Sequence, residues 1–195
     1  MAGINFEEEG QMKRLIKDIV IHCSATPNGK DFGSDDIDAM HKIRGFKRDR
    51  QAVRNFNPTL SHIGYHFVVT VDGALETGRG LEEVGAHVKQ NNGNAKSIGV
   101  CMIGTDKFTL SQWEALSNCM LGLASRISGH PVQSAASCVN TLKDMGIKIR
   151  GHRDYSPDLN GDGVIQRNEW IKDCPNFSVR DWVSGGMVPL EENIL

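Results

Sequence analysis

Three residues of types that bind zinc stand at separate places in the chain: His22, His152 and Cys174. Catalytic zinc usually takes three protein ligands from histidine, cysteine and carboxylate side chains and leaves a fourth position for water. His22 and His152 each follow a β-branched run, which indicates that each lies at the end of a strand. The spacing alone leaves another interpretation open, because a strand-end histidine is also often a hydrogen-bonded structural residue.

A second group of possible ligands lies between His152 and Cys174. The segment from residue 158 to residue 169 fits the twelve-residue calcium-loop pattern, with Gly163 at the position of the sharp turn. The alternative is a solvated turn without an ion. If calcium binds, we expect it to be structural and to hold the segment that presents Lys172 and Cys174. Its expected ligands are oxygen atoms of Asp158, Asn160, Asp162, Val164 (through its carbonyl group), Gln166 and Glu169.

The elements that must position these residues follow from hydrophobic periodicity and turn signals. Thr109 and Gln112 form a capping-box pattern, Asp72-Gly73 predicts a two-residue hairpin, and Ser34 is a candidate helix N-cap. The order of elements predicts an α/β fold, a single domain with a central mixed β-sheet flanked by helices. We expect strands at residues 19–23, 63–71, 74–77, 97–104 and 147–150, helices at 34–44, 109–126, 132–145 and 178–183, and a loop at 81–94.

Strand alternation gives expectations for individual side chains near these candidates. His66 is expected to point away from Tyr65 and to be structural. Cys23 is expected to point away from His22 and to be a buried thiol.

The composition is that of a globular protein of 195 residues with 39% hydrophobic content and a formal net charge of −2. This charge gives no sign of a nucleic-acid partner. A basic stretch from Lys42 to Arg54 is interpreted as a loop, either a solvated face or an anion-binding patch. No apolar run is long enough to span a membrane. The five cysteines lack a disulfide-framework spacing and indicate thiols and ligands.

The chain divides into three expected parts. Residues 1–16 form a polar N-terminal extension without the apolar stretch of a secretory signal. Residues 17–184 form the domain that carries the candidate ligands, with the calcium loop as an insertion. Residues 185–195 form an irregular tail, and we expect a monomer.

Six short motifs occur in register along residues 17–183, and together they resemble the N-acetylmuramoyl-L-alanine amidases of the phage-lysozyme type. These amidases share a fold with peptidoglycan-recognition proteins. The motifs are Ile-Val-Ile-His22-Cys-Ser-Ala-Thr, Ile63-Gly-Tyr65-His-Phe, Val84-Gly-Ala-His87, Asn94-Ala-Lys-Ser97-Ile-Gly-Val, Gly151-His152-Arg-Asp and Lys172-Asp-Cys174-Pro.

The resemblance implies a zinc amidase that cleaves the amide bond between the lactyl group of N-acetylmuramic acid and L-alanine in peptidoglycan. It places the zinc on His22, His152 and Cys174. It places catalytic roles on Tyr65 and Lys172, which would stabilise the charge of the tetrahedral oxyanion or shuttle a proton, and it leaves open which of them is the base.

The resemblance also locates His87 in a loop near the substrate groove, where substrate-binding and structural roles are both open. Amidases of this type often connect the last two motifs by a shorter loop, so the 158–169 segment departs from the pattern.

The resemblance further implies a phage or prophage endolysin that stays in the cytoplasm until it is released to the cell wall. Two alternatives remain. One is a peptidoglycan-binding module without activity, although Cys174 argues against it, because many recognition-only relatives lack this cysteine. The other is an amidase that acts on soluble muropeptides.

Overall fold

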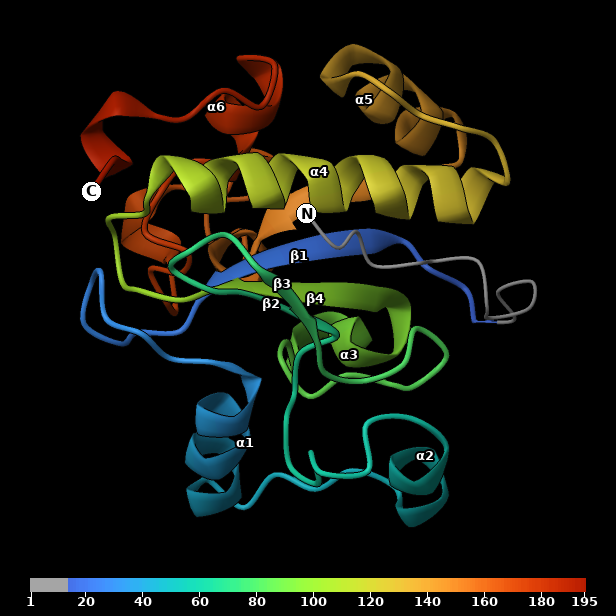
Figure 1. The fold of residues 1–195 in the computed structure, drawn as a ribbon. Helices are drawn as coiled ribbons and strands as arrows, with labels where there is room; N and C mark the ends of the chain where they lie inside the picture. The colour runs from blue at the N-terminus through green and yellow to red at the C-terminus, as the bar shows by residue number, and fades with distance from the viewer. Residues whose placement is uncertain (1–13) are drawn as a thin grey trace.

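A mixed sheet with the strand order β3–β2–β4–β1–β5 lies at the centre of the molecule (Figure 1). The computed structural model describes residues 14–195. β1 is parallel to both β4 and β5, β2 is parallel to β4, and β3 is antiparallel to β2. The strands are β1 (Asp18–Cys23), β2 (Phe67–Val69), β3 (Leu75–Thr77), β4 (Ser97–Met102) and β5 (Lys148–Gly151).

Helices cover both faces of this sheet, with α4, α5 and α6 on one side and α1 and α2 on the other (Figure 1). The predicted α/β domain with a central mixed sheet is therefore confirmed. The α-helices are α1 (Ser34–Ile43), α2 (Arg50–Asn55), α3 (Gly93–Lys96), α4 (Leu110–Ser128), α5 (Ala135–Asp144) and α6 (Val179–Ser184). Short 3-10 helices occupy Gln90–Asn92, His152–Tyr155, Arg167–Glu169 and Glu191–Asn193.

The side chains of β1 alternate between the two faces of the sheet. Ile19 and Ile21 belong to the larger core under α4, together with Trp113 of that helix. A second cluster, which includes Ile37 of α1 and Ile63, fills the opposite face. Full burial of an aliphatic side chain of this size contributes about 1.5–3 kcal/mol. His22 lies between Ile21 and Cys23 in β1, so it faces the side of α1.

The ends of α4 follow the predicted chemistry closely. The Thr109 hydroxyl accepts a hydrogen bond from the Gln112 N–H at 3.1 Å, and the Gln112 side chain accepts one from the Thr109 N–H at 3.0 Å. Gly129 ends the helix with φ at 73°, a left-handed conformation that favours glycine. The capping-box prediction is confirmed.

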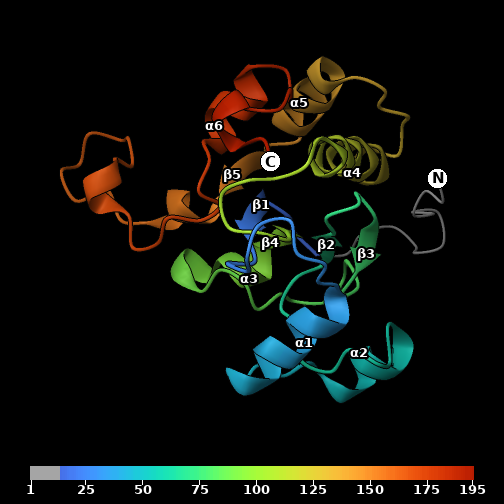
Figure 2. The same cartoon turned by 60° about the vertical axis from the view of Figure 1, so that its left-hand side comes forward.

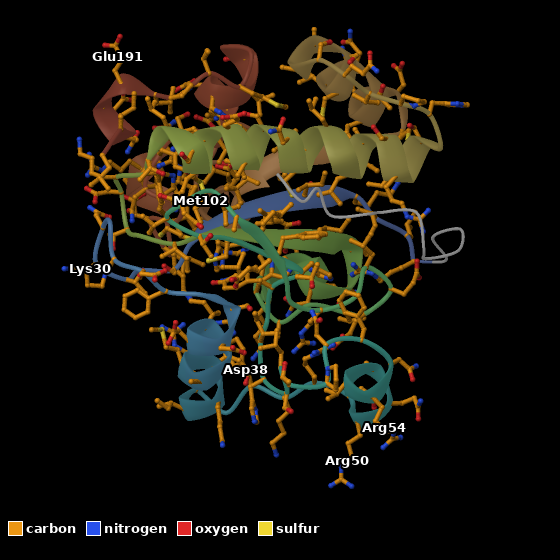
Figure 3. All side chains as sticks on the ribbon, viewed as in Figure 1. Lys30, Asp38, Arg50, Arg54, Met102 and Glu191 are labelled. Carbon is orange, nitrogen blue, oxygen red and sulfur yellow. The ribbon has the colours of Figure 1, made fainter. Side chains whose placement is uncertain are left out.

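The interpretation of the basic stretch as a loop was wrong at its C-terminal end, where α2 forms. Asp49 caps this helix by accepting the N–H groups of Gln51 and Ala52. Arg50 and Arg54 point away from the body of the molecule (Figure 3). Arg48 is buried instead, and its guanidinium contacts Glu83 at 2.8 Å. The stretch therefore divides into a solvated helix and one structural arginine.

Three further boundaries differ from expectation. The N-cap of α1 is Gly33 rather than Ser34, because the Ser34 N–H is held by the carboxylate of Glu76 at 2.6 Å. The β2–β3 connection is longer than two residues, since the ladder ends at the Val69–Leu75 pair. The predicted loop at 81–94 also contains the start of α3.

The C-terminal residues pack against the start of α4. Asn193 is buried, and Ile194 forms a parallel bridge with Phe108. At the other end, the prediction for residues 1–13 lies outside the described part of the chain, while Ile16 is buried in the larger core. No helix of the described residues is long and apolar enough to cross a membrane.

Candidate metal centre

The pairing of β1 with β5 brings His22 and His152 together. Ile21 is in register with Gly151, so the next residue of each strand lies at the same edge of the sheet. The two imidazole rings have centroids 4.8 Å apart at an angle of 68°. Parallel strands place their carboxyl ends at one edge, which is where the sequence predicted the site.

Cys174 reaches this edge through contacts made by the Gly-His-Arg-Asp segment. The Arg153 N–H donates to the carbonyl oxygen of Cys174 at 2.9 Å. The Asp154 carboxylate accepts the Gly151 N–H at 2.8 Å and closes the turn. A Cβ atom on Gly151 would come within 3.0 Å of Pro175 Cδ. This motif is thus explained by the close approach of the two segments.

His22, His152 and Cys174, called the His–His–Cys cluster below, offer ligand atoms that all lie within 4.8 Å of one another. The Cys174 Sγ lies 3.8 Å from His22 Nδ1. Tetrahedral zinc with ordinary Zn–N and Zn–S bond lengths separates two such atoms by about 3.5 Å. The donor set and its spacing therefore fit zinc. Within residues 14–195 it is the one group of three or more such side chains with this spacing.

The protonation of the cluster also suits a metal. Burial lowers the pKa of His22 well below its usual value, and the neighbouring histidines and Lys172 add to the shift. Burial and the charge of Lys172 lower the pKa of His152 to about 4. Both imidazoles are therefore neutral at pH 7, as a ligand requires. Hydrogen bonding with Cys23 and burial raise the pKa of the Cys174 thiol, so metal binding must release its proton.

Tyr65 and Lys172 lie beside this cluster. The Tyr65 ring is 5.0 Å from the His22 ring, centroid to centroid. Burial raises the pKa of Tyr65 well above its usual value, so its hydroxyl stays protonated and can donate a hydrogen bond. Lys172 is exposed, and its positive charge acts on both cluster histidines. Cation and hydroxyl are thus available at the same edge of the sheet.

His87 and His66 lie deeper, behind His22. His87 Nδ1 is 2.9 Å from His22 Nε2, and His87 Nε2 is 3.4 Å from the Ser97 hydroxyl. Both ring nitrogens of His87 thus face protein partners, which favours the structural of the two roles weighed for it. His66 is fully buried, with Nδ1 accepting the Gly99 N–H at 3.0 Å, in line with its expected structural role.

Sequence reasoning missed three neighbours of the site. His41 of α1 packs against Tyr65 with ring centroids 5.2 Å apart. Ser97 contacts His87. Cys23 is buried as predicted, yet its Sγ lies 3.9 Å from that of Cys174, since both approach the end of β1. The motif that contains Ser97 was the only available signal.

The 158–169 loop projects from the body of the molecule (orange in Figure 2). Its carboxylates accept backbone N–H groups of the same loop. Asp158 accepts those of Gly161 and Gly163, both at 2.7 Å. Glu169 is buried and accepts those of Leu159 and Gln166, also at 2.7 Å. The loop carboxylates do not form a second group with metal-ligand spacing among the described residues.

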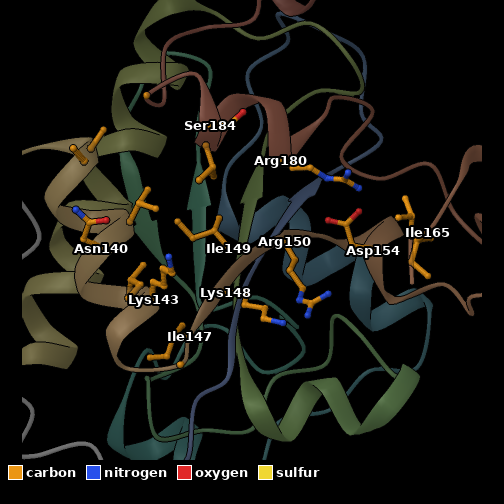
Figure 4. Close-up of a pocket in the computed structure, with 18 of the residues that line it drawn as sticks. Asn140, Lys143, Ile147, Lys148, Ile149, Arg150, Asp154, Ile165, Arg180 and Ser184 are labelled. Carbon is orange, nitrogen blue, oxygen red and sulfur yellow. The ribbon is translucent and has the colours of Figure 1, made fainter. Parts of the chain in front are cut away.

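A cavity of about 770 Å³ lies elsewhere, between α5, β5, α6 and part of the 158–169 loop (Figure 4). Lys143, Lys148 and Arg180 stand around apolar residues such as Ile149. None of the His–His–Cys cluster residues lines it. The cavity is therefore separate from the candidate metal centre.

Comparison with known proteins gives a consistent result. A family model described as N-acetylmuramoyl-L-alanine amidase matches residues 12–175. An uncharacterized protein of Haemophilus influenzae is 40% identical over 126 residues, which cover 60% of this chain and 92% of that protein. The endolysin of Escherichia phage T7 is 28% identical over 190 residues, which cover 93% of this chain and 92% of the endolysin.

Two solved structures show the same fold. The endolysin amidase LysCS from Clostridium intestinale has a TM-score of 0.54 at 20% identity, covering 90% of this chain and 86% of that chain. An AmpD derivative has a TM-score of 0.52 at 19% identity, with the same coverage of both chains. The stretch matched by the family model contains all three residues of the His–His–Cys cluster, together with Tyr65 and Lys172.

Proposed function

Because the chain belongs to the N-acetylmuramoyl-L-alanine amidase family, we propose that it is a zinc-dependent peptidoglycan amidase. Its substrate is the amide bond between the lactyl group of N-acetylmuramic acid and L-alanine. The observation that carries this proposal is the His–His–Cys cluster, whose ligand atoms lie within 4.8 Å of one another at the carboxyl end of β1. The relatives named endolysins support peptidoglycan as the substrate class.

The residues in and around the cluster have different roles in amide hydrolysis. A zinc ion held there supplies Lewis-acid polarisation of the amide carbonyl and activation of water. Tyr65 is protonated because of its burial, and it donates a hydrogen bond to the carbonyl oxygen as negative charge develops there. Lys172 stabilises the same charge or passes a proton to the leaving nitrogen. Buried His22 keeps a neutral imidazole for the metal.

Purified sacculi provide the test. Zinc-loaded protein should release fragments with new L-alanine amino termini, identified by mass spectrometry, and a chelator should abolish this release until zinc is restored. Cys174→Ser should lose zinc and activity. Lys172→Ala should lose activity, while its control Lys143→Ala, an exposed lysine of α5, should keep it.

The alternatives predict different results in the same assay. Zinc-loaded protein that binds sacculi without releasing any L-alanine terminus would be a binding module. Cleavage of soluble muropeptides without cleavage of sacculi would assign the enzyme to fragment turnover. Either result would overturn the wall-degrading function.

A structural calcium ion in the 158–169 loop remains a prediction, carried by the sequence pattern alone. Millimolar calcium should raise the melting temperature, and Asp158→Ala or Glu169→Ala should abolish the rise. An unchanged melting temperature in the wild-type protein would contradict the prediction.

Three expectations of organisation are part of the proposal. Residues 17–184 form the catalytic unit, the protein is a monomer, and it stays in the cytoplasm until release to the wall, as the endolysin relatives suggest. Cleavage of sacculi by a protein limited to residues 17–184 tests the first expectation, and light scattering of the zinc-loaded full chain tests the second. A dimer, or a truncated protein without activity, would contradict them.

A further inference from the structure

His87 occupies a slot that two glycines make for its ring. A Cβ atom on Gly99 of β4 would lie 2.7 Å from the ring atoms Cγ and Cδ2, and one on Gly85 would lie 2.5 Å from Cδ2. Real Cβ atoms do not come this close, so both positions require glycine for space. The backbone of His87 is held as well, because its N–H donates to Asn94 Oδ1 at 2.7 Å. The imidazole therefore has a built and narrow seat behind the His–His–Cys cluster.

The donor and acceptor of each hydrogen bond around this ring can be assigned, beginning with a backbone carbonyl group. The Ser97 hydroxyl lies 2.8 Å from the carbonyl oxygen of Gly93, and this oxygen can only accept. The Ser97 hydroxyl has one proton, and it donates this proton to the Gly93 carbonyl oxygen. Its oxygen must then accept the longer bond of 3.4 Å from His87, so His87 carries its proton on Nε2.

The same logic extends to the metal ligand. A neutral His87 with its proton on Nε2 has a bare Nδ1, which accepts at 2.9 Å from His22 Nε2–H. His22 then has no proton on Nδ1, the nitrogen that lies 3.8 Å from Cys174 Sγ. His87 is buried, and burial disfavours the charged form of an imidazole.

We propose that His87 is a positioning residue that presets the tautomer of His22, so that Nδ1 offers a lone pair to zinc before the metal arrives. Ser97 and the carbonyl group of Gly93 anchor the order of donors. Gly85 and Gly99 hold the ring in line. Motif residues that have no catalytic role, namely Gly85, His87, Ser97 and Gly99, thus act together to orient His22. The inference rests on the proposed function in taking zinc as the metal.

The device has a direct physical consequence for metal affinity. A ligating histidine whose other nitrogen is bonded is fixed in orientation and tautomer, and loss of such a partner costs about 10–100-fold in metal affinity or activity. Without His87, His22 can also hold its proton on Nδ1 and turn that nitrogen away from a metal. His87→Ala should therefore weaken zinc binding by about 10–100-fold.

The deciding experiment reads the tautomers by nitrogen-15 NMR of the imidazoles at pH 7, in the metal-free and the zinc-loaded full chain. We expect both His22 and His87 to carry the proton on Nε2 in both states. A proton on His22 Nδ1 in the metal-free protein would overturn the inference. This measurement uses the wild-type protein and does not depend on a variant that folds.

Zinc affinities from chelator competition give the second readout. His87→Asn provides a side-chain oxygen near the place of Nδ1 and should restore much of the affinity that His87→Ala loses. Ser97→Ala should yield mixed His87 tautomers and weaker zinc binding. Its control is Ser117→Ala, because that hydroxyl bonds carbonyl groups of Trp113 and Met187 away from the cluster. Wild-type zinc affinity in His87→Ala would refute the inference.

These measurements require no substrate, so they distinguish failure of the positioning role from failure of the proposed activity. Preset tautomers and tight zinc binding without release of L-alanine termini would refute the proposed activity alone. Active enzyme with a proton on His22 Nδ1 in its metal-free form would refute the positioning role alone.

Discussion

The backbone N–H of Arg153 donates to the carbonyl oxygen of Cys174 at 2.9 Å, across the base of the 158–169 loop. The Ile171 N–H donates to the Ser156 hydroxyl at 3.0 Å and closes the same base a second time. These direct contacts hold Cys174 in place without help from the loop. The sequence led us to expect that calcium holds the segment that presents Lys172 and Cys174. The contacts at the base of the loop favour a different result, in which calcium affects stability more than zinc binding.

Asp158→Ala tests this separation of the two metal sites. Its zinc affinity is measured by chelator competition with and without calcium. The affinity should change by less than about 10-fold, the smallest effect expected when a metal ligand loses its hydrogen-bond partner. The control is Asp144→Ala, an exposed carboxylate of α5. A larger loss of zinc affinity in Asp158→Ala alone would show that the loop positions Cys174 after all.

Tyr65→Phe tests the hydrogen-bond donor. Removal of one donor to a developing oxyanion lowers kcat by about 100- to 1000-fold, and zinc affinity should not change. The matched control is Tyr155→Phe, whose hydroxyl donates to Asp18 at 2.8 Å and lies in a different cluster of the core. That variant should lose about 1 kcal/mol of stability with kcat retained. Equal kcat values for the two variants would remove Tyr65 from the mechanism.

The local part of this site could be predicted from the sequence, because short-range signals determine it. The Ile-Val-Ile run that ends at His22 and the capping box at Thr109 need only a few neighbouring residues. The contact between His22 and His87 joins positions 65 residues apart. The Arg48–Glu83 pair similarly joins positions 35 apart. Periodicity carries no information on such pairs, so the role of His87 and the burial of Arg48 required the folded chain.

The pH dependence of stability should reveal the buried neutral His41. Burial, with the charges of Arg44 and Arg79, lowers its pKa from 6.5 to about 4. The unfolded chain binds a proton at His41 as the pH falls below 6.5, and the folded chain does not until about pH 4. The contribution of neutral His41 to the free energy of unfolding is therefore fully present above pH 6.5. It falls by about 3 kcal/mol between pH 6.5 and pH 4 and does not change further below pH 4.

His41→Asn isolates this contribution, since its side-chain oxygen can accept the Gly64 N–H that His41 Nδ1 accepts at 2.9 Å. The free energy of unfolding in urea at pH 7 and at pH 4 should differ less in the variant than in the wild-type protein. His62→Asn is the control, because it replaces a nearby histidine whose ring contacts the carbonyl oxygen of Phe46 and not the Gly64 N–H. An unchanged difference between the two pH values in His41→Asn would contradict the prediction.

The neighbouring thiols of Cys23 and Cys174 should make the metal-free protein sensitive to oxidation. Their Sγ atoms are 3.9 Å apart and need to approach to about 2.05 Å to bond. Diamide takes two electrons and two protons from the pair, forms one disulfide and is itself reduced to the hydrazine. The disulfide has no thiolate to bind zinc. Zinc binding and two titratable thiols should therefore be lost together, and both should return after reduction with dithiothreitol.

Bound zinc should protect the pair, because the metal holds the Cys174 sulfur as a thiolate ligand with reduced reactivity towards diamide. Cys23→Ala should keep its zinc-binding capacity after diamide treatment of the metal-free protein. Cys138→Ala, which removes a buried thiol next to the Met120 carbonyl group of α4, should remain as sensitive as the wild-type protein. Loss of zinc binding in oxidised Cys23→Ala would show that Cys174 reacts alone, without its neighbour in β1.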